Sequence, residues 1–272
     1  MRQLRTIYYN PLCRLNSEPK EPMTYFLATD KDKAEFDRHG FIVVPNLFKP
    51  DEAAALGETA RRDAKTWEDA TERADATGNR TILAVRDDLG DDVYSSIARS
   101  RRVTESMSTL LGEEVYHYHH KLMLKEPKVG GAWEWHQDYG YWYNYGCLFP
   151  SMASCYVAID KAVKANGCLQ VLSGSHQLGR LEHGKVGGQT GADPERMPAI
   201  LERFDLKYVE MQPGDGLFFH ANLLHRSDQN TSDDPRWSLI CCYNTRSNSP
   251  YEVKRHNGYS PIDVVDDAAV FG

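Results

Sequence analysis

The segment VYHYHHKLMLK, residues 115–125, marks the point where the character of the chain changes. From here on, short runs of β-branched and aromatic residues alternate with Gly, Pro and Asn, a spacing typical of an all-β domain. The expected strands are Val115–Lys125, Trp133–Asp138, Met152–Ile159, Cys168–Leu172, Lys207–Met211, Gly216–His220 and Trp237–Asn244. This pattern predicts a mainly β fold with flanking helices, a closed or double-sheet domain such as a jelly roll.

The first third of the chain carries helical signals instead. A capping-box pattern at 29–32 predicts the start of a helix, and Gly40 is expected to end it. The apolar run Phe41–Val44 then predicts a short buried strand. Pro50, followed by two acidic residues, predicts the start of a second helix that runs to about Glu68.

The remaining N-terminal segments complete the expected division of the chain. The polar stretch 69–80 is expected to be an exposed loop, and 93–111 to contain one or two more helices. Residues 1–22 lack the apolar run of a secretory signal, and we expect them to be a disordered extension. We therefore predict a single domain, 23–272, with a helical part 23–112 and a β-helix core 113–247.

Composition excludes several classes of protein. The chain has 272 residues, a net charge of −7 and no basic block, so nucleic acid is not an expected partner. No apolar run reaches the roughly 18 residues of a membrane span. The six cysteines lack CxxC spacing, which favours free thiols in a reducing cytoplasm. We expect a cytoplasmic protein that is a monomer or a homodimer.

The stretch WEWHQDYGYW, residues 133–142, suggests a metal site. His136 and Asp138 are two apart in an expected strand, so both side chains should lie on the same face. A third ligand is expected from the later segment FFHANLLHRSDQN, where His225 is the main candidate and His220 its rival. Two histidines and one carboxylate are the ligands of non-haem Fe(II) oxygenases. The alternative is an ordinary surface pair or a hydrogen-bonded histidine.

A cation near these residues predicts an anion site. Arg236 opens the expected strand that follows His225, and if the two segments pair, its guanidinium can point into the barrel. A buried arginine is costly unless a carboxylate meets it. 2-Oxoglutarate offers a keto acid to the metal and a distal carboxylate to the arginine, with the Ser227 hydroxyl as a further donor. The alternative is a surface arginine paired with Asp233 or Asp234.

Several motifs together resemble the phytanoyl-CoA dioxygenase family, which includes ectoine hydroxylase. The resemblance spans residues 33–244, and its metal motif is most similar to the ectoine hydroxylase form. The motifs are FDRHGFIVVPNLF (36–48), WEWHQD (133–138), NGCLQVLSGSH (166–176), GDGLFFHANLLHRSDQN (214–230) and PRW (235–237). The resemblance implies a double-stranded β-helix, the cupin-like jelly roll, and an Fe(II)- and 2-oxoglutarate-dependent hydroxylase.

The resemblance also implies roles for individual residues. Fe(II) is expected on His136, Asp138 and His225, with O₂ as the oxidant and ascorbate as a stimulant of turnover. 2-Oxoglutarate, which is converted to succinate and CO₂, is expected to contact Arg236, Ser227, Tyr156 and Met123. Lys121 shares the expected strand face of His117, His119 and Met123. It is therefore either a cation of this pocket, counted with the cosubstrate contacts, or a residue of the rim.

The substrate side is less defined. His119 and Trp142 fall where ectoine hydroxylase contacts its substrate, but His119 replaces a glutamine, so ectoine is not the expected substrate. Trp142 and Tyr143 can face an ammonium group, although plain barrel packing is the alternative. Three cations are expected to meet an anionic group: His176, Arg180 and Lys164. We predict a small, polar, zwitterionic metabolite, such as an amino acid, a betaine-like compound or an aminophosphonate.

Two other functions remain open at this point. One is a protein-modifying 2-oxoglutarate oxygenase, which would need an open groove for its target. The other is a non-catalytic β-barrel that binds a metal or a ligand. An intact ligand set with its arginine favours the hydroxylase of a small molecule.

Overall fold

The computed structural model describes residues 25–63 and 70–271, so the extension expected at 1–22 lies outside the described part. Six α-helices are described: α1 (Asp30–His39), α2 (Pro50–Arg62), α4 (Val93–Arg99), α5 (Arg101–Leu111), α6 (Asp138–Trp142) and α7 (Met197–Leu201). None of the helices in this part of the chain is long and apolar enough to cross a membrane.

The strands begin early in the chain and dominate after residue 115. They are β1 (Phe41–Val44), β2 (Thr71–Ala74), β3 (Arg80–Arg86), β4 (Val115–Lys125), β5 (Trp133–His136), β6 (Met152–Ala158), β7 (Leu169–Leu172), β8 (His183–Val186), β9 (Gln189–Ala192), β10 (Leu206–Val209), β11 (Gly216–His220), β12 (His225–Ser227) and β13 (Arg236–Thr245). All seven strands expected after residue 114 are present; two match the expected bounds and the ends of the others shift by one or two residues.

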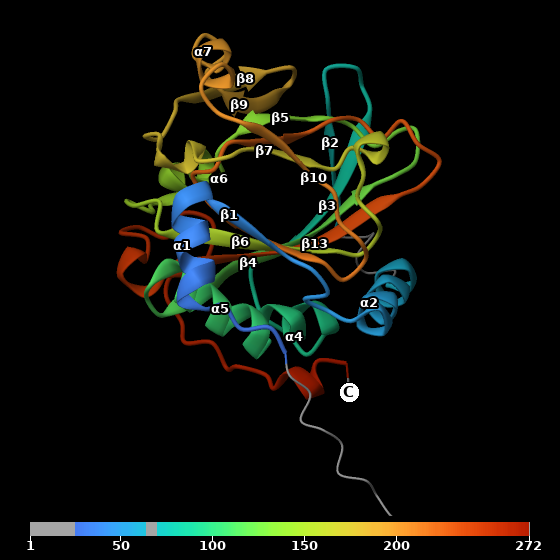
Figure 1. Cartoon of the computed structure of the whole chain (residues 1–272), viewed down its shortest axis with the longest axis vertical. Helices are drawn as coiled ribbons and strands as arrows, with labels where there is room; N and C mark the ends of the chain where they lie inside the picture. The colour runs from blue at the N-terminus through green and yellow to red at the C-terminus, as the bar shows by residue number, and fades with distance from the viewer. Residues whose placement is uncertain (1–24, 64–69, 272) are drawn as a thin grey trace, which may run out of the picture.

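Two antiparallel sheets form the body of the molecule (Figure 1). The larger sheet has the strand order β1-β11-β6-β13-β4-β3-β2, and the smaller has β10-β7-β12-β5. A separate hairpin, β8–β9, lies beyond the smaller sheet, and α1, α4 and α5 lie on the other side of the larger sheet (Figure 1). This is the double-stranded β-helix, or jelly roll, with flanking helices that the sequence predicts.

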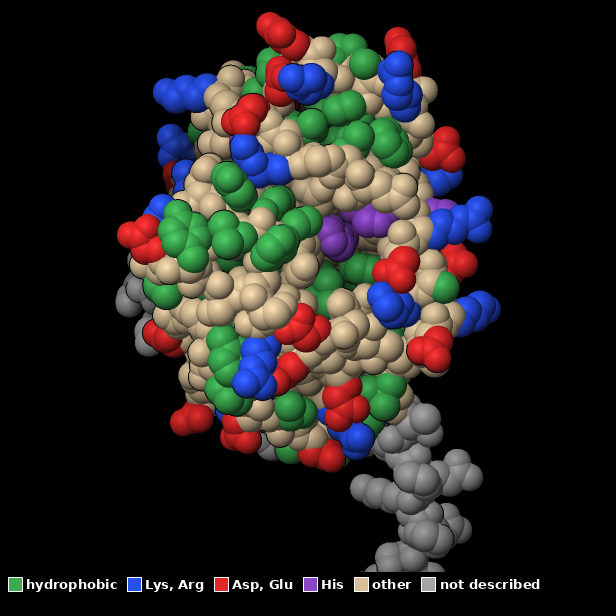
Figure 2. Space-filling model, turned by 90° about the vertical axis from the view of Figure 1, so that its left-hand side faces the viewer, with side chains coloured by type: hydrophobic (Ala, Val, Ile, Leu, Met, Phe, Trp, Pro, Cys, Tyr) green, Lys and Arg blue, Asp and Glu red, His purple; other side chains and the backbone are tan. Residues whose placement is uncertain are grey.

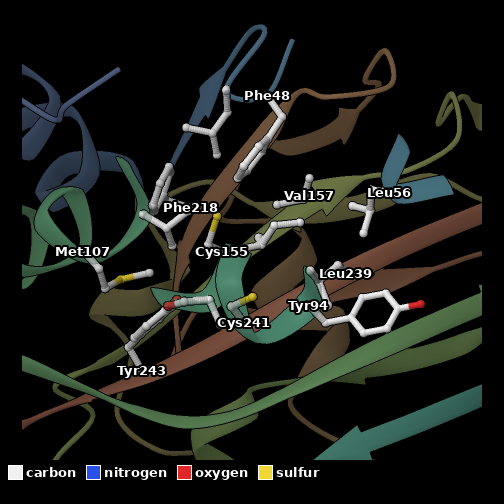
Figure 3. Close-up of a cluster of buried hydrophobic side chains, with 14 of the residues drawn as sticks. Phe48, Leu56, Tyr94, Met107, Cys155, Val157, Phe218, Leu239, Cys241 and Tyr243 are labelled. Carbon is white, nitrogen blue, oxygen red and sulfur yellow. The ribbon is translucent and has the colours of Figure 1, made fainter. Parts of the chain in front are cut away.

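The larger sheet is buried on both faces because its strands alternate between two cores. Phe218 and Cys155 point toward the helices, together with side chains of α2, α4 and α5, and Figure 3 shows this cluster. Their neighbours Leu217 and Tyr156 point to the opposite face, toward the smaller sheet. The second face is the wall of the space between the sheets, where the site described below lies.

Local signals at the helix ends behave as expected. The Thr29 side chain accepts a hydrogen bond from the backbone of Asp32, and the Asp32 carboxylate accepts one from the backbone of Thr29. Gly40 ends α1 in the left-handed conformation, with φ of 80°, which suits glycine. Pro50 opens α2, but this helix ends at Arg62, earlier than the predicted Glu68.

Within the segment 69–80, expected to be a loop, residues 71–80 instead belong to a hairpin. β2 pairs with β3 and extends the edge of the larger sheet. All four residues of β2 are exposed, so no alternation of apolar and polar residues marks the strand. Backbone hydrogen bonds to β3, rather than burial, hold it in place.

A buried arginine joins the helices to the C-terminal end of the chain. The Arg102 guanidinium, only 1% exposed, donates to Glu52 at 2.8 Å and to Asp267 at 2.8 Å. It also donates to the carbonyl of Leu47 at 2.9 Å. Because the arginine neutralises two carboxylates from α2 and from the C-terminal segment, it fixes both against α5.

Removing this charge should destabilise the protein. For Arg102→Met we expect the free energy of unfolding to fall by about 3 kcal/mol, because two acidic side chains lose their shared partner. Urea denaturation followed by circular dichroism measures the change. Arg101→Met is the matched control, since Arg101 is exposed and pairs only with Glu105 one turn away. If the two variants unfold at the same urea concentration, the buried network does not carry this stability.

Candidate active site

A cavity of about 590 Å³ lies between the two sheets. Its walls come from β4, β6, β11 and β13 of the larger sheet and from β5, β7 and β12 of the smaller one. The β2–β3 and β8–β9 hairpins and the C-terminal segment form its rim. Aromatic and charged side chains share this lining: Trp133, Tyr141, Trp142, Tyr145, Phe219, Arg73, Lys185 and Arg255.

His136, Asp138 and His225 converge at one end of the cavity. His136 is the last residue of β5, and His225, the first of β12, pairs with it directly. The two Nε2 atoms lie 3.6 Å and 3.9 Å from the same oxygen, Oδ1 of Asp138. All three residues are at most 5% exposed. Among the described residues, theirs is the group of histidine, cysteine and acidic side chains close enough to hold one metal ion.

The path to this cluster differs from the one expected. His136 and Asp138 were predicted to share a strand face, but β5 ends at His136 and Asp138 begins α6. The turn into the helix, not strand alternation, brings the carboxylate beside the imidazole. His136 and Asp138 lie close together as predicted, but not because they share a strand face.

Hydrogen bonds orient both imidazoles for a cation. Nδ1 of His136 lies 2.8 Å from the carbonyl of Glu134, and Nδ1 of His225 lies 2.9 Å from the carbonyl of Leu223. Each Nδ1 therefore carries the proton and donates it, which leaves the Nε2 lone pair directed at the cluster. Oδ2 of Asp138 is buried and has no hydrogen-bond partner. A metal ion fits this donor set and would satisfy that oxygen.

Ionisation in the cluster also favours a cation. Burial and the neighbouring His136 lower the pKa of His225 to about 3, so its imidazole is neutral at pH 7. Burial alone would raise the pKa of Asp138, but Lys121, His136 and His225 hold it well below its usual range. The cluster therefore combines a carboxylate with the neutral imidazole of His225, which suits a metal ion.

His220, the rival ligand, lies elsewhere. Its Nδ1 accepts a hydrogen bond from the backbone of Asn222 at 3.0 Å, and its ring packs against Phe36 of α1 and His176. Figure 2 views the molecule from the side on which α1 lies in Figure 1, and histidine side chains are visible there in a hollow of the surface. His220 is not part of the cluster between the sheets.

Arg236 is fully buried beside the cavity. Its Nη1 donates to the Tyr156 hydroxyl at 2.6 Å, and its Nη2 lies 3.9 Å from the sulfur of Met123. Nε has no partner, and no carboxylate among the described residues pairs with this guanidinium. The surface alternative is therefore wrong: Arg236 is 0% exposed, and Asp233 pairs with Lys128 instead.

The strands that carry His225 and Arg236 do not pair with each other. β12 belongs to the smaller sheet, whereas β13 lies between β4 and β6 in the larger one. Arg236 reaches the space between the sheets from the opposite wall. The smaller sheet thus carries the two histidines, and the larger sheet carries the arginine.

Lys125 is a residue that the sequence analysis missed. It lies opposite Arg236 in the β4–β13 register and is 0% exposed. Its ammonium group donates to the Ser227 hydroxyl at 2.9 Å and to the carbonyl of Asp228 at 2.5 Å. Burial and the charge of Arg236 lower its pKa well below the usual range. Lys125 lies two residues beyond Met123, so the alternation of side chains along a strand predicts it on the same face as Met123 and Lys121.

His119, Lys121 and Trp142 line the cavity on the side away from Arg236. His119 meets Trp142 edge to face, with ring centroids 5.8 Å apart. His117, expected on the same face as His119, is not there. A bulge in β4 inserts one extra residue between them and turns His117 outward against His120.

Four predicted substrate contacts lie outside the cavity lining. Tyr143 is 43% exposed and lies beneath the guanidinium of Arg180, which pairs with Glu182. His176 packs under α1, where its Nε2 lies 3.0 Å from the carbonyl of Asp37. Lys164 lies over the ring of Tyr208. These side chains contact one another, Glu182, Tyr208 or the backbone, and none of them reaches the cavity.

A jelly roll in which two histidines and a carboxylate meet between the sheets defines an iron(II)- and 2-oxoglutarate-dependent dioxygenase. The family model described as "Phytanoyl-CoA dioxygenase (PhyH)" matches residues 36–238. The chain therefore belongs to the phytanoyl-CoA dioxygenase family, as the sequence motifs predict.

Individual relatives share about a quarter of their aligned residues with this chain. L-proline trans-4-hydroxylase of Streptomyces griseoviridis is 25% identical over 236 residues, which cover 80% of this chain and 87% of that protein. Ectoine dioxygenase of Halomonas elongata is 28% identical, over 81% of this chain and 72% of that protein. The crystal structure of EctD from S. alaskensis with 2-oxoglutarate and 5-hydroxyectoine superposes with a TM-score of 0.73, at 24% identity and 90% coverage of both chains.

The outward histidines of β4 predict an acid-sensitive protein. His117 and His120 are buried, with Nε2 of one 3.0 Å from Nδ1 of the other. Burial lowers their pKa values to about 3 and about 4. In the unfolded chain they take up protons below about pH 6.5. Their contribution to stability is therefore complete above that pH and is lost as the pH falls toward 4.

We expect the free energy of unfolding of the metal-free protein to fall between pH 6.5 and 4. Each such histidine adds a slope of up to about 1.4 kcal/mol per pH unit. His120→Gln should reduce the slope, because it removes one group that is protonated only in the unfolded state. Urea titrations at several pH values measure it. A slope that is identical in the variant would contradict the assignment.

Proposed function

We propose that His136, Asp138 and His225 hold Fe(II) and that Arg236 anchors the distal carboxylate of 2-oxoglutarate, so that the enzyme hydroxylates a C–H bond of a small polar molecule. One observation supports this most strongly. A fully buried guanidinium, with no carboxylate partner among the described residues, contacts Tyr156 and Met123. These two side chains line the same cavity as the two histidines and the aspartate. Such a charge is costly to bury unless an anionic ligand meets it.

The bound iron supplies the oxidising chemistry, in which O₂ and 2-oxoglutarate give succinate and CO₂. The residues of the chain orient the reactants. The backbone carbonyls of Glu134 and Leu223 fix the two imidazole rings. The Tyr156 hydroxyl accepts a hydrogen bond from Arg236 and so sets the direction of the guanidinium. Lys125 donates to Ser227, which leaves the Ser227 hydroxyl proton free to point at an anion.

Met123 and Tyr156 are proposed to line the cosubstrate, and His119 and Trp142 the substrate. The aromatic walls limit the access of water, which protects a reactive centre and orients the C–H bond. The relatives named above are hydroxylases of proline and of ectoine, and we propose an amino acid or a comparably small substrate here. A cavity of about 590 Å³ suits such a molecule.

The setting of the enzyme follows from the same features. We propose a cytoplasmic monomer or homodimer that does not act on nucleic acid or on a membrane. Five described cysteines are buried free thiols, which fits a reducing compartment: Cys147, Cys155, Cys168, Cys241 and Cys242. The protein-modifying and non-catalytic alternatives receive no comparable support.

Removing one proposed ligand should abolish iron binding. We expect His136→Ala to retain less than about a tenth of the bound iron, because ligand losses of this kind cost a factor of ten or more in metal affinity. Anaerobic Fe(II) loading, desalting and an iron assay measure the stoichiometry. Succinate formation after exposure to air should be lost in parallel.

His220→Ala is the matched control, because His220 is the other buried histidine of the same sequence motif and lies outside the cluster. This variant should bind iron as the unaltered protein does. Full iron binding by the His136 variant, or its loss in the His220 variant, would mean that the ligands are assigned wrongly.

The proposed anchor has its own test. Arg236→Ala should raise the KM for 2-oxoglutarate at least about 30-fold, because one partner of a buried charge pair is removed. Initial rates of succinate release over a range of 2-oxoglutarate concentrations give this value. Arg61→Ala serves as the control, since Arg61 is partly exposed and pairs with Asp160. A KM that does not move would show that another residue anchors the cosubstrate.

A further inference from the structure

The cavity carries more positive charge than the proposed cosubstrate uses. Among the seven charged side chains of its lining, Glu72 pairs with Arg80 and Arg226 with Asp228. Asp138 belongs to the metal cluster. The other four are cations that have no acidic partner in the described part of the chain: Arg73, Lys121, Lys185 and Arg255. This surplus occurs in a protein whose net charge is −7.

Lys121 is the innermost of these cations. It lies in β4 between His119 and Met123, so it separates the proposed substrate side from the cosubstrate side. Its charge helps to lower the pKa of Asp138 and, after burial and the charge of His256, that of His119. The ammonium group is thus close to both the metal cluster and the substrate side.

Arg255 reaches the cavity from the opposite direction, on the C-terminal segment. Its Nη1 donates to the Tyr145 hydroxyl at 3.1 Å, and its guanidinium lies over the Tyr145 ring. The next residue, His256, is 4% exposed, and its Nδ1 lies 2.5 Å from a carboxylate oxygen of Asp87. Its ring stacks on His119 with centroids 4.2 Å apart. These contacts hold Arg255 at the mouth of the cavity.

Both cations are near the stacked imidazoles. Burial lowers the pKa of His256, Asp87 opposes this, and the charges of Arg255 and Lys121 lower it further. The pKa of His119 is also well below its usual range because the ring is buried. The two rings are therefore neutral and offer hydrogen bonds, while Lys121 and Arg255 supply the charge.

When Fe(II) and 2-oxoglutarate are bound, no charge in the described part of the site compensates Lys121 and Arg255. Two positive charges of Fe(II) and one of Arg236 balance the carboxylate of Asp138 and the two carboxylates of 2-oxoglutarate. A zwitterionic substrate would bring an ammonium group into a region that is already positive. Like charges placed together disfavour a partner by several kcal/mol, so the cavity disfavours a cationic group near Lys121.

We propose that the substrate has a net negative charge and that its anionic group, a carboxylate or a phosphonate, binds between Lys121 and Arg255 beside the stacked rings of His119 and His256. This inference rests on the proposed function, because it assigns the substrate of the same site. Arg255 and His256 lie outside the family match, which ends at residue 238, whereas Lys121 and His119 lie within it.

Matched ligand pairs can test the inference. The full-length protein is loaded with Fe(II) and saturating 2-oxoglutarate without O₂, and binding is measured by isothermal titration calorimetry. L-Glutamate is compared with L-glutamine for a carboxylate, and 2-amino-4-phosphonobutanoate with L-glutamine for a phosphonate. L-Proline is the zwitterionic reference. Saturating cosubstrate prevents the acids from simply occupying the Arg236 site.

We expect at least one acid to bind about 30-fold more tightly than L-glutamine. Lys121→Met and Arg255→Met should each remove most of this preference, and Lys121→Arg should restore part of it. Lys185→Met is the matched control, because it removes one unpaired charge from the β8 side of the same rim. It should keep the preference. The acid that binds more tightly relative to L-glutamine shows whether the anionic group of the substrate is a carboxylate or a phosphonate.

Three results would overturn the inference. The first is equal binding of acid and amide, or no binding of either acid. The second is tighter binding of L-proline than of both acids. The third is an equal loss in the Lys185 variant, which would mean a diffuse field and not a defined subsite. The proposed function is tested separately, by iron- and 2-oxoglutarate-dependent succinate release without any added substrate, so the two failures are distinguishable.

Discussion

The site depends on one strand pairing. β5 and β12 are short, and His136 and His225 face each other in their register. A shift by one residue would turn one imidazole away from the other, because side chains alternate along a strand. The carbonyls of Glu134 and Leu223 then set the rotation of each ring from within its own segment. The turn from β5 into α6 brings in the carboxylate. Three ligands are thus positioned by backbone geometry that lies within a few residues of each one.

The opposite wall explains why this arrangement needs ligands to be stable. The larger sheet places Arg236 and Lys125 side by side, both fully buried and without a carboxylate partner in the described structure. Each is satisfied only in part, Arg236 by Tyr156 and Lys125 by Ser227 and a carbonyl. Two adjacent basic groups in a dry interior are costly, and burial together with the charge of Arg236 already lowers the pKa of Lys125 well below its usual range. An anionic cosubstrate between the sheets would offset that cost, so the pocket is electrostatically prepared for a diacid before any ligand binds.

The sequence predicted the larger elements and the chemical groups, and the reasons are physical. The long strands carry clear apolar runs because they are buried on both faces. β2, β3, β8, β9 and β12 were not predicted. The strands β2, β8 and β9 carry little apolar alternation, β12 has only three residues, and the apolar run of β3 was overlooked. The three residues of the proposed metal site and the buried Arg236 were singled out from residue type and spacing. The geometry that joins them was not, because a helix start and two separate sheets are not visible in local sequence.

Other parts of the site carried a weaker signal. The alternation of side chains along β4, which placed Lys121 and Met123 on one face, also places Lys125 there, but Lys125 was overlooked. Arg255 and His256 had no signal at all, because they belong to an irregular segment without periodicity. The reverse error affected Tyr143, His176 and Arg180, which lie near the motifs in sequence but outside the cavity. Proximity to a motif along the chain is a poor guide once loops fold back on themselves.

On the proposed assignment, the C-terminal segment separates the selection of substrate from the oxidation chemistry. It lies beyond the part of the chain that matches the family, yet it adds Arg255 and His256 to the cavity wall. Asp87 holds it at the cavity, and Arg102 holds it at the helical layer through Asp267. Neither contact involves a proposed metal ligand or the 2-oxoglutarate anchor. Changes in this segment can therefore alter which molecule is accepted, while the cluster between the two sheets stays intact.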